Sequence, residues 1–144
     1  MDIIIGNSTE LIKQAHAIRY QVFTVEQKIP RTLDLDGLDP ISSHALVTKQ
    51  GALVATARLT VNDDGSAVMA RVAVIQAYRG QGVAAKVVTA LIEHAREMGI
   101  TAIKIHAHDY LRNYYERYGF TFIQAVEIVG GHQLIAMQYQ IDPA

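Results

Sequence analysis

Residues 78–84 read Tyr-Arg-Gly-Gln-Gly-Val-Ala, and this stretch decides how the chain folds. An apolar, β-branched run over residues 68–74 precedes it and predicts a buried strand. Residues 84–98 are apolar at helical spacing, and Gly99 supplies the left-handed residue that commonly ends a helix. A strand, a glycine turn and a helix collect free backbone N–H groups at the positive end of the helix dipole. The stretch therefore predicts a turn that can bind phosphate.

The glycines of this turn would let a pyrophosphate approach the main chain closely, and Arg79 would add a charge-assisted contact. Other phosphate loops match poorly. The turn lacks the Lys-Ser/Thr pair of nucleoside triphosphate loops and the third glycine of dinucleotide loops. By itself, the turn leaves phosphate binding and a plain tight turn both open.

A wider pattern surrounds the turn. Residues 79–84 fit Arg-x-x-Gly-x-Ala, Arg-Val-Ala-Val precedes them at 71–74, and Tyr-Tyr-Glu-Arg-Tyr-Gly-Phe follows at 114–120. With these motifs at this spacing, the chain resembles the GNAT family of N-acetyltransferases over nearly all of its length. Residues 18–27 and the Gly-Gly-His-Gln-Leu-Ile-Ala-Met segment at 130–137 also resemble a small bacterial subgroup of unassigned acetyltransferases.

The expected elements agree with the mixed α/β fold that the resemblance implies. Asn7 and Glu10 resemble a capping box that opens a helix, with apolar residues at helical spacing from Leu11 to Val22. The remaining expected elements are a first strand at 3–5, strands at 44–49, 53–61 and 68–74, the central helix, a strand at 102–106, a short helix at 109–118, and closing strands at 120–129 and 133–140. We predict one domain over residues 1–144, in which a bulge makes the central mixed sheet splay at the cofactor site between flanking helices.

Composition limits the classes of function. A length of 144 residues, half of them hydrophobic, with a net charge of −1, predicts one domain with a substantial core and neither nucleic acid nor a membrane as partner. The chain has no cysteine, so disulfides, thiolate metal sites and a cysteine nucleophile are excluded. No signal-like start or membrane-length apolar run occurs, which favours a cytoplasmic protein. We leave a homodimer open.

The segment from Arg31 to Pro40 is acidic, with aspartates at 34, 36 and 39. It does not complete a calcium-binding loop, because no glutamate closes it at the required spacing. We expect a solvated loop without a metal ion, and we expect Arg58 and Arg71 to anchor it rather than to contact substrate.

The resemblance implies acetyl-CoA as cosubstrate, with the pantetheine arm paired to the end of the central strand as an added strand would be. The pyrophosphate would lie on the amides of the turn. The residues assigned to cofactor binding in this way are Val72, Ala73, Val74, Arg79, Gly80, Gln81, Gly82, Val83 and Ala84.

Two further cofactor contacts are less typical of the family. His108 stands where the family often has an asparagine that bonds the cofactor amide, and histidine can still donate and accept hydrogen bonds. Lys86 and Arg112 are candidate partners for the 3′-phosphate.

Tyr115 occupies the tyrosine position of the family's Tyr-Glu-x-x-Gly-Phe motif. The resemblance therefore implies that Tyr115 contacts the cofactor and protonates the leaving thiolate as a general acid. The alternative is that Tyr115 belongs to a packing cluster with Tyr110, Tyr114 and Tyr118, which is the interpretation we favour for Tyr110 and Tyr118.

Many better-known members of the family carry a glutamate on the central strand as general base. This chain departs from them, because residues 67–74 hold no carboxylate. Glu26, beside the acceptor loop, is our first choice by a narrow margin, and His132 on the last hairpin is the second. A water relay without a single base is the third option. We expect an acetyl-CoA-dependent N-acyltransferase that acts on a small-molecule or peptide amine by direct transfer in a ternary complex. The main alternative is a non-catalytic module that senses acyl-CoA, and a more distant one is transfer to a hydroxyl group.

Overall fold

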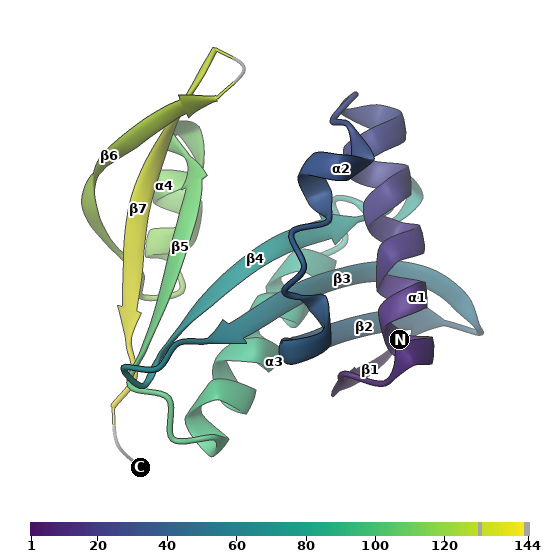
Figure 1. The fold of residues 1–144 in the computed structure, drawn as a ribbon, viewed down its shortest axis with the longest axis horizontal. Coiled ribbons are helices and arrows are strands. Elements are labelled where there is room, and N and C mark those ends of the chain that lie inside the picture. The colour runs from purple at the N-terminus through teal and green to yellow at the C-terminus, as the bar shows by residue number, and fades with distance from the viewer. Residues whose placement is uncertain (130, 143–144) are drawn as a thin grey trace.

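The computed structural model describes residues 1–129 and 131–142. Seven strands form one mixed sheet in the order β1-β2-β3-β4-β5-β7-β6 (Figure 1). The elements in chain order are β1 (Asp2–Gly6), α1 (Thr9–Arg19), the π-helical segment η1 (Tyr20–Glu26), α2 (Arg31–Asp34), η2 (Asp39–Ile41), β2 (Ser43–Lys49), β3 (Ala52–Val61), β4 (Ser66–Val74), η3 (Gln76–Tyr78), α3 (Val83–Glu97), β5 (Ala102–His108), η4 (Asp109–Leu111), α4 (Arg112–Glu116), β6 (Thr121–Val129) and β7 (His132–Gln140). The predicted mixed α/β fold and order of elements are confirmed. No helix in the part of the chain that the structure describes is long and apolar enough to cross a bilayer.

The two faces of the sheet are covered by different helices. On β2, Ala45 and Val47 belong to the hydrophobic cluster that α3 joins, whereas Leu46 between them packs with Leu11 and Ile18 of α1. Successive side chains of a strand point to opposite faces, so α1 and α3 pack on opposite sides of the sheet. Burial on both faces explains why the inner strands are apolar almost throughout.

The sheet splits at β4, as the resemblance implied. The register between β3 and β4 shifts between Thr56 and Arg58, where two residues of β4, Arg71 and Val72, stand opposite one residue of β3. This is a β-bulge, and Arg71 within it has a φ of 58°. The parallel pairing of β4 with β5 covers only Ser66–Val68 against 102–104, so it ends before the bulge is reached. The two strands then diverge (Figure 1), which leaves the end of β4 open on the side that faces β5.

The first helix differs in detail from its prediction. Ser8, not Asn7, is the N-cap, and its hydroxyl oxygen accepts a hydrogen bond from the Leu11 amide at 3.2 Å. After Arg19 the helix widens into η1, in which the Gln27 amide donates to the Val22 carbonyl at 3.2 Å. Such π-helical turns are uncommon and often occur at functional sites.

The acidic loop is exposed along most of its length, as expected, but two of its three aspartates are not. Asp34 and Asp39 are buried, and Arg19, itself 1% exposed, donates to both of them, at 3.0 Å to Asp34 and 2.8 Å to Asp39. Arg58 pairs with Asp39 at 3.1 Å and with Asp36, so the anchoring role predicted for it is confirmed. The expectation was wrong for Asp34 and Asp39, because these ion pairs join segments far apart in sequence, which local composition cannot show.

Arg71 supplies the second anchor. Its guanidinium contacts Asp34 at 3.0 Å and Asp36 at 3.3 Å, which confirms the other anchoring prediction. Because Arg71 lies in the bulge, it ties the loop directly to the point where the sheet splits. The loop is therefore held beside the opening between β4 and β5.

We expect Asp39→Asn to lower the free energy of unfolding by about 3 kcal/mol or more, because it leaves the buried Arg19 guanidinium incompletely paired. Glu93→Gln is the control: it removes an exposed pair with Arg96 and should change stability little. Chemical denaturation monitored by circular dichroism measures both. Equal stability of the two variants would contradict a structural role for the buried pairs.

The same network predicts acid sensitivity. Hydrogen bonds from Arg58 hold the pKa of Asp36 at about 2. Burial acts to raise the pKa of Asp39, but hydrogen bonds from Arg19, His16 and Arg58, together with the charge of Arg19, hold it below its ordinary value. Depressed carboxyl pKa values stabilise the fold above the unfolded value of 3.8, and this stabilisation is lost as pH falls through about 2. Wild-type stability should thus fall steeply below pH 4, and less steeply in Asp39→Asn.

Candidate active site

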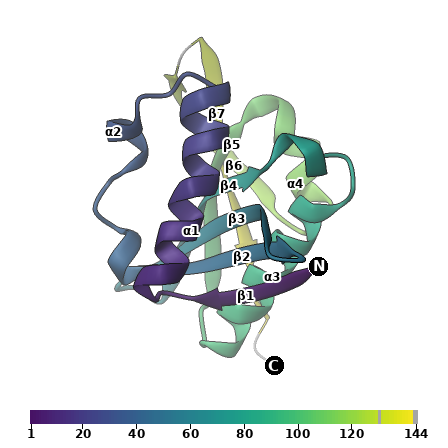
Figure 2. The same cartoon turned by 90° about the vertical axis from the view of Figure 1, so that its right-hand side faces the viewer.

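Two cavities open beside the end of β4. One, of about 250 Å³, lies between that end, the turn after it and the start of α3, with Tyr114 of α4 completing its lining. The other, of about 390 Å³, is lined from η1 and α2 on one side and from β5 and α4 on the other. Val74 lines the smaller cavity and Val72 the larger, so the two adjoin along one strand. Figure 2 shows α2 and α4 on opposite sides of β4.

The smaller cavity has the features of an anion site. Gly80 and Gly82 adopt φ values of 79° and 75°, which only glycine adopts readily. A Cβ atom added at either position would meet no other part of the protein within 4 Å, so the space beside both glycines is open. Gly82 is the N-cap of α3, and no side chain of the described residues caps this helix. The first amides of α3 are therefore available to a ligand, and their arrangement suits a diphosphate.

Most of the predicted cofactor residues surround this cavity. The predicted residues in its lining are Val74, Arg79, Gly80, Gly82, Val83 and Ala84. Gln81 instead directs its side-chain amide toward the Ala77 carbonyl at 3.4 Å, and the Ala73 side chain is buried with the α1 cluster. Sequence reasoning missed Tyr78 and Tyr114 as lining residues, although both stand next to the motifs that it used.

Arg79 is held by two contacts. Its Nε donates to the Val74 carbonyl at 2.9 Å, and its terminal nitrogen pairs with the Glu26 carboxylate at 2.7 Å. Glu26 thus joins η1 to the glycine turn at residues 78–84. Among the described residues that line the larger cavity, Gln27 is present and Glu26 is not.

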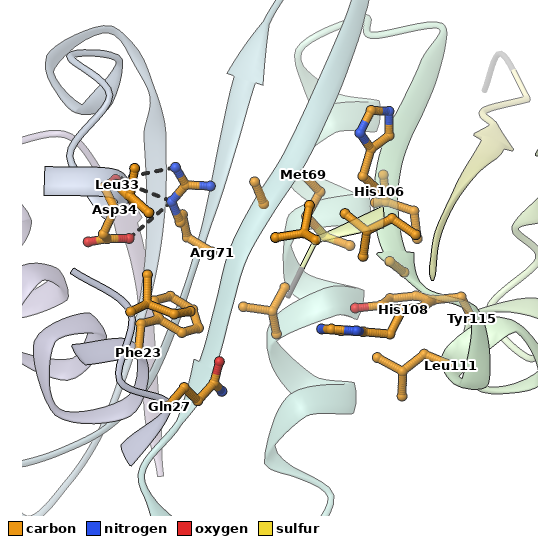
Figure 3. A pocket seen from close by; sticks show the side chains of 17 residues that line it. Phe23, Gln27, Leu33, Asp34, Met69, Arg71, His106, His108, Leu111 and Tyr115 are labelled. Atoms are coloured by element: carbon orange, nitrogen blue, oxygen red, sulfur yellow. Dashed lines mark hydrogen bonds and ion pairs between the residues drawn. The ribbon is translucent and has the colours of Figure 1, made fainter. Parts of the chain in front are cut away.

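Tyr115 points into the larger cavity, next to His108 (Figure 3). Its ring is 8% exposed and packs edge-on against Tyr114 and Phe120. Burial, reinforced by Tyr114, raises the pKa of the Tyr115 phenol to about 12, so the hydroxyl keeps its proton at neutral pH. A protonated hydroxyl in a mostly apolar cavity is suited to donate a proton to a nascent anion.

The other tyrosines behave differently. The Tyr118 hydroxyl donates to the Tyr114 hydroxyl at 2.8 Å, and burial together with this bond raises the pKa of Tyr118. Tyr110 is 69% exposed and stacks on His108 with 5.1 Å between ring centroids. Tyr118 therefore packs as expected, whereas Tyr110 covers the outer side of a histidine.

His108 and His132 are brought together from β5 and β7. Their rings meet edge to face with centroids 5.0 Å apart, and the His132 side chain is exposed beside the cavity. The Nδ1 atom of His108 is buried and has no hydrogen-bond partner within residues 1–129 and 131–142. This nitrogen is shielded from solvent, so it is not open to a ligand in this arrangement of side chains. Gly130 of the motif before His132 lies outside the described residues.

The candidate partners of the 3′-phosphate are exposed. Lys86 lies on the first turn of α3, close to the phosphate turn, which fits an electrostatic contact. The Arg112 guanidinium lies over the Phe122 ring at 4.3 Å and pairs with Glu116 at 3.4 Å. Lys86 is thus the better placed of the two.

Sequence reasoning also missed the helical wall of the larger cavity, which consists of Phe23, Gln27, Ile29 and Leu33. Phe23 belongs to the π-helical segment η1 and Gln27 is its C-cap, and ordinary helical periodicity does not predict the directions of side chains in such a segment. Figure 3 shows Phe23 and Leu33 on the side of the cavity opposite Tyr115. No group of three or more metal-ligating side chains occurs in residues 1–129 and 131–142.

The model of the Acetyltransferase (GNAT) family matches residues 11–120 of this chain. The chain belongs to the GNAT acetyltransferase family. Among curated proteins, this GNAT chain is 26% identical over 129 residues to the Uncharacterized N-acetyltransferase YjcF of Bacillus subtilis, with 90% of this chain and 91% of YjcF covered. It is 30% identical to Protein ElaA of Escherichia coli, with 86% of this chain and 84% of that one covered.

Solved structures agree with the family. An acyl-CoA N-acyltransferase from Pseudomonas aeruginosa superposes with a TM-score of 0.88 at 28% identity, covering 96% of this chain and 98% of the other. This GNAT protein is therefore an acetyltransferase, and the family implies acetyl-CoA-dependent acyl transfer. The open amides at the head of α3, with the two glycines before them, fit the diphosphate of that cosubstrate.

Proposed function

We propose that this GNAT enzyme transfers an acetyl group to the nitrogen of a small-molecule or peptide amine by direct transfer in a ternary complex. The observation that carries the proposal is the pair of cavities at the split between β4 and β5, one lined by the phosphate turn and the other by Tyr115. An acetyl donor and an amine can approach from the two sides and meet at the end of β4.

The chemistry needs two proton transfers. Acetyl-CoA supplies the acetyl group as an activated thioester. As the amine nitrogen bonds to the acetyl carbon, the carbon–sulfur bond breaks, and the Tyr115 hydroxyl donates its proton to the departing sulfur. The chain has no cysteine to carry an acyl group between two half-reactions, which supports direct transfer.

The amine must also lose a proton, because ammonium groups of the lysine type titrate near ~10.4. Glu26 was our first choice for the base, but its carboxylate is paired with Arg79 beside the cofactor turn. His132 is not among the described residues that line the larger cavity either, but its ring contacts His108, which lines it. We therefore prefer His132 as the base and assign Glu26 to orienting Arg79.

A pH–rate profile tests this preference. We expect His132→Gln to lose the acidic limb of kcat/KM and Glu26→Gln to keep it, because only a base near the amine has to be deprotonated before reaction. Loss of the limb in Glu26→Gln alone would return the role to the carboxylate. An unchanged limb in both variants would mean that water and backbone carry the proton.

The overall function is tested by following CoA release with a panel of amines, with mass spectrometry of the products. An amide product that forms only in the presence of protein and acetyl-CoA supports the proposal. Release of CoA without acetylated amine, or acylation of an alcohol in the same panel, would contradict it.

A further inference from the structure

Large apolar side chains form much of both walls of the larger cavity. They are Phe23, Ile29 and Leu33 on the helical side, and Leu111, Val129 and Leu134 on the opposite side. Leu33 is 69% exposed and Val129 is 53% exposed, so large apolar side chains stand at its mouth on both sides. Apolar side chains gathered around a concave site are typical of a surface that a ligand covers.

The charges of the cavity are already neutralised. Asp34 is the carboxylate among the described lining residues. It forms ion pairs with Arg19 and with Arg71, each at 3.0 Å. Two acidic neighbours of the cavity are also paired, Asp36 with Arg58 and Glu26 with Arg79, each at 2.7 Å. A ligand with a second ammonium group would have to bury that charge without a free carboxylate, which is costly.

Tyr115 marks the inner end of the cavity, because it is 8% exposed, whereas the exposed Leu33 and Val129 stand at the mouth. The lining also holds the polar side chains of Gln27, Asp34, Arg71, His106 and His108. A ligand with one polar end and an apolar body matches this distribution if its nitrogen enters first.

We propose that the acceptor is a monoamine with an alkyl or arylalkyl body and no second cationic group. This inference rests on the proposed amine acetylation and adds the class of acceptor. The cavity walls hold the apolar body, and the inner polar end receives the amine nitrogen.

Hexylamine and 1,6-diaminohexane form a matched pair for the test, because they differ only in the second ammonium group. We expect kcat/KM to be at least about tenfold higher for hexylamine. Across ethylamine, butylamine and hexylamine we expect kcat/KM to rise about threefold per added methylene group, as apolar burial predicts. Calorimetry of the same amines with the CoA-saturated protein measures acceptor binding independently of turnover.

Two leucines give a matched pair of variants. Leu33→Glu places an unpaired carboxylate at the mouth of the cavity, so we expect the preference to shift toward 1,6-diaminohexane by about tenfold or more. Leu35→Glu is the control, because Leu35 is also exposed and lies two residues away but does not line the cavity. It should leave the preference unchanged.

Three results would overturn the inference. The first is a preference of the wild type for the diamine, and the second is failure of hexylamine to bind the CoA complex. The third is an effect of chain length that appears when hexanoyl-CoA replaces acetyl-CoA but is absent from the amine series. The last result would assign the cavity to the acyl chain. Failure of the proposed function is distinct, since it would appear as bound acetyl-CoA and bound hexylamine without CoA release.

Discussion

Gly82→Glu is expected to abolish acetyl-CoA binding, with a loss of affinity of at least about 100-fold. Gly82 precedes α3 at φ 75°, and a built Cβ meets no atom within 4 Å, so a side chain there enters the open space in front of the helix. A glutamate would place a negative charge where the diphosphate must lie and would compete for the same amides. Charge-assisted hydrogen bonds contribute about 1.5–3 kcal/mol each, which sets the size of the expected loss.

Backbone strain must be separated from the loss of the anion site, because a non-glycine residue at positive φ costs about 1 kcal/mol. Gly51→Glu is the matched control. Gly51 has φ 82° and equally open surroundings, but lies in the hairpin between β2 and β3. Isothermal calorimetry on both folded variants gives the answer. Unchanged affinity in Gly82→Glu, or equal losses in both, would contradict the assignment of the turn.

The structure of the glycine turn at residues 78–84 was predictable because its determinants are contiguous. The strand, the two glycines and the amphipathic helix follow one another within residues 68–98, and each element is specified by its own residues. Arg79 shows the limit of such reasoning. Its place in the motif was evident, but its contact with Glu26 depends on how α1 and η1 cross the sheet, and no local pattern encodes that crossing.

The acceptor side was less predictable for the same reason. The apolar stripe from Leu11 to Val22 identified the buried face of the first helix, but it did not show that Phe23, which packs against that face, also lines the larger cavity. Arg58 and Arg71 were correctly expected to anchor the acidic loop, because cations on neighbouring strands need partners. The buried Arg19 was not foreseen, because an arginine at the end of a helix is usually exposed.

Tyr115→Phe is expected to lower kcat by roughly 10²–10⁴-fold while leaving the affinity for acetyl-CoA nearly intact. The phenylalanine ring keeps the packing against Tyr114 and Phe120, so the variant should fold normally and lose only the proton donor. Tyr118→Phe is the control: it removes a hydroxyl that bonds to Tyr114 and does not line either cavity. It should cost about 1 kcal/mol of stability and little activity.

The pH dependence gives the Tyr115 prediction a second readout. Because burial raises the pKa of Tyr115 to about 12, the hydroxyl stays protonated as the pH passes the ordinary tyrosine value near ~10. Wild-type kcat should therefore not fall as the pH passes that value. A fall there in the wild type, absent from Tyr115→Phe, would mean that Tyr115 loses its proton at the ordinary pKa. Steady-state assays of wild type, Tyr115→Phe and Tyr118→Phe across pH 7–11, at saturating acetyl-CoA and amine, measure both effects. If Tyr115→Phe retains wild-type kcat, the departing sulfur takes its proton from water or from His108, and Tyr115 is a packing residue.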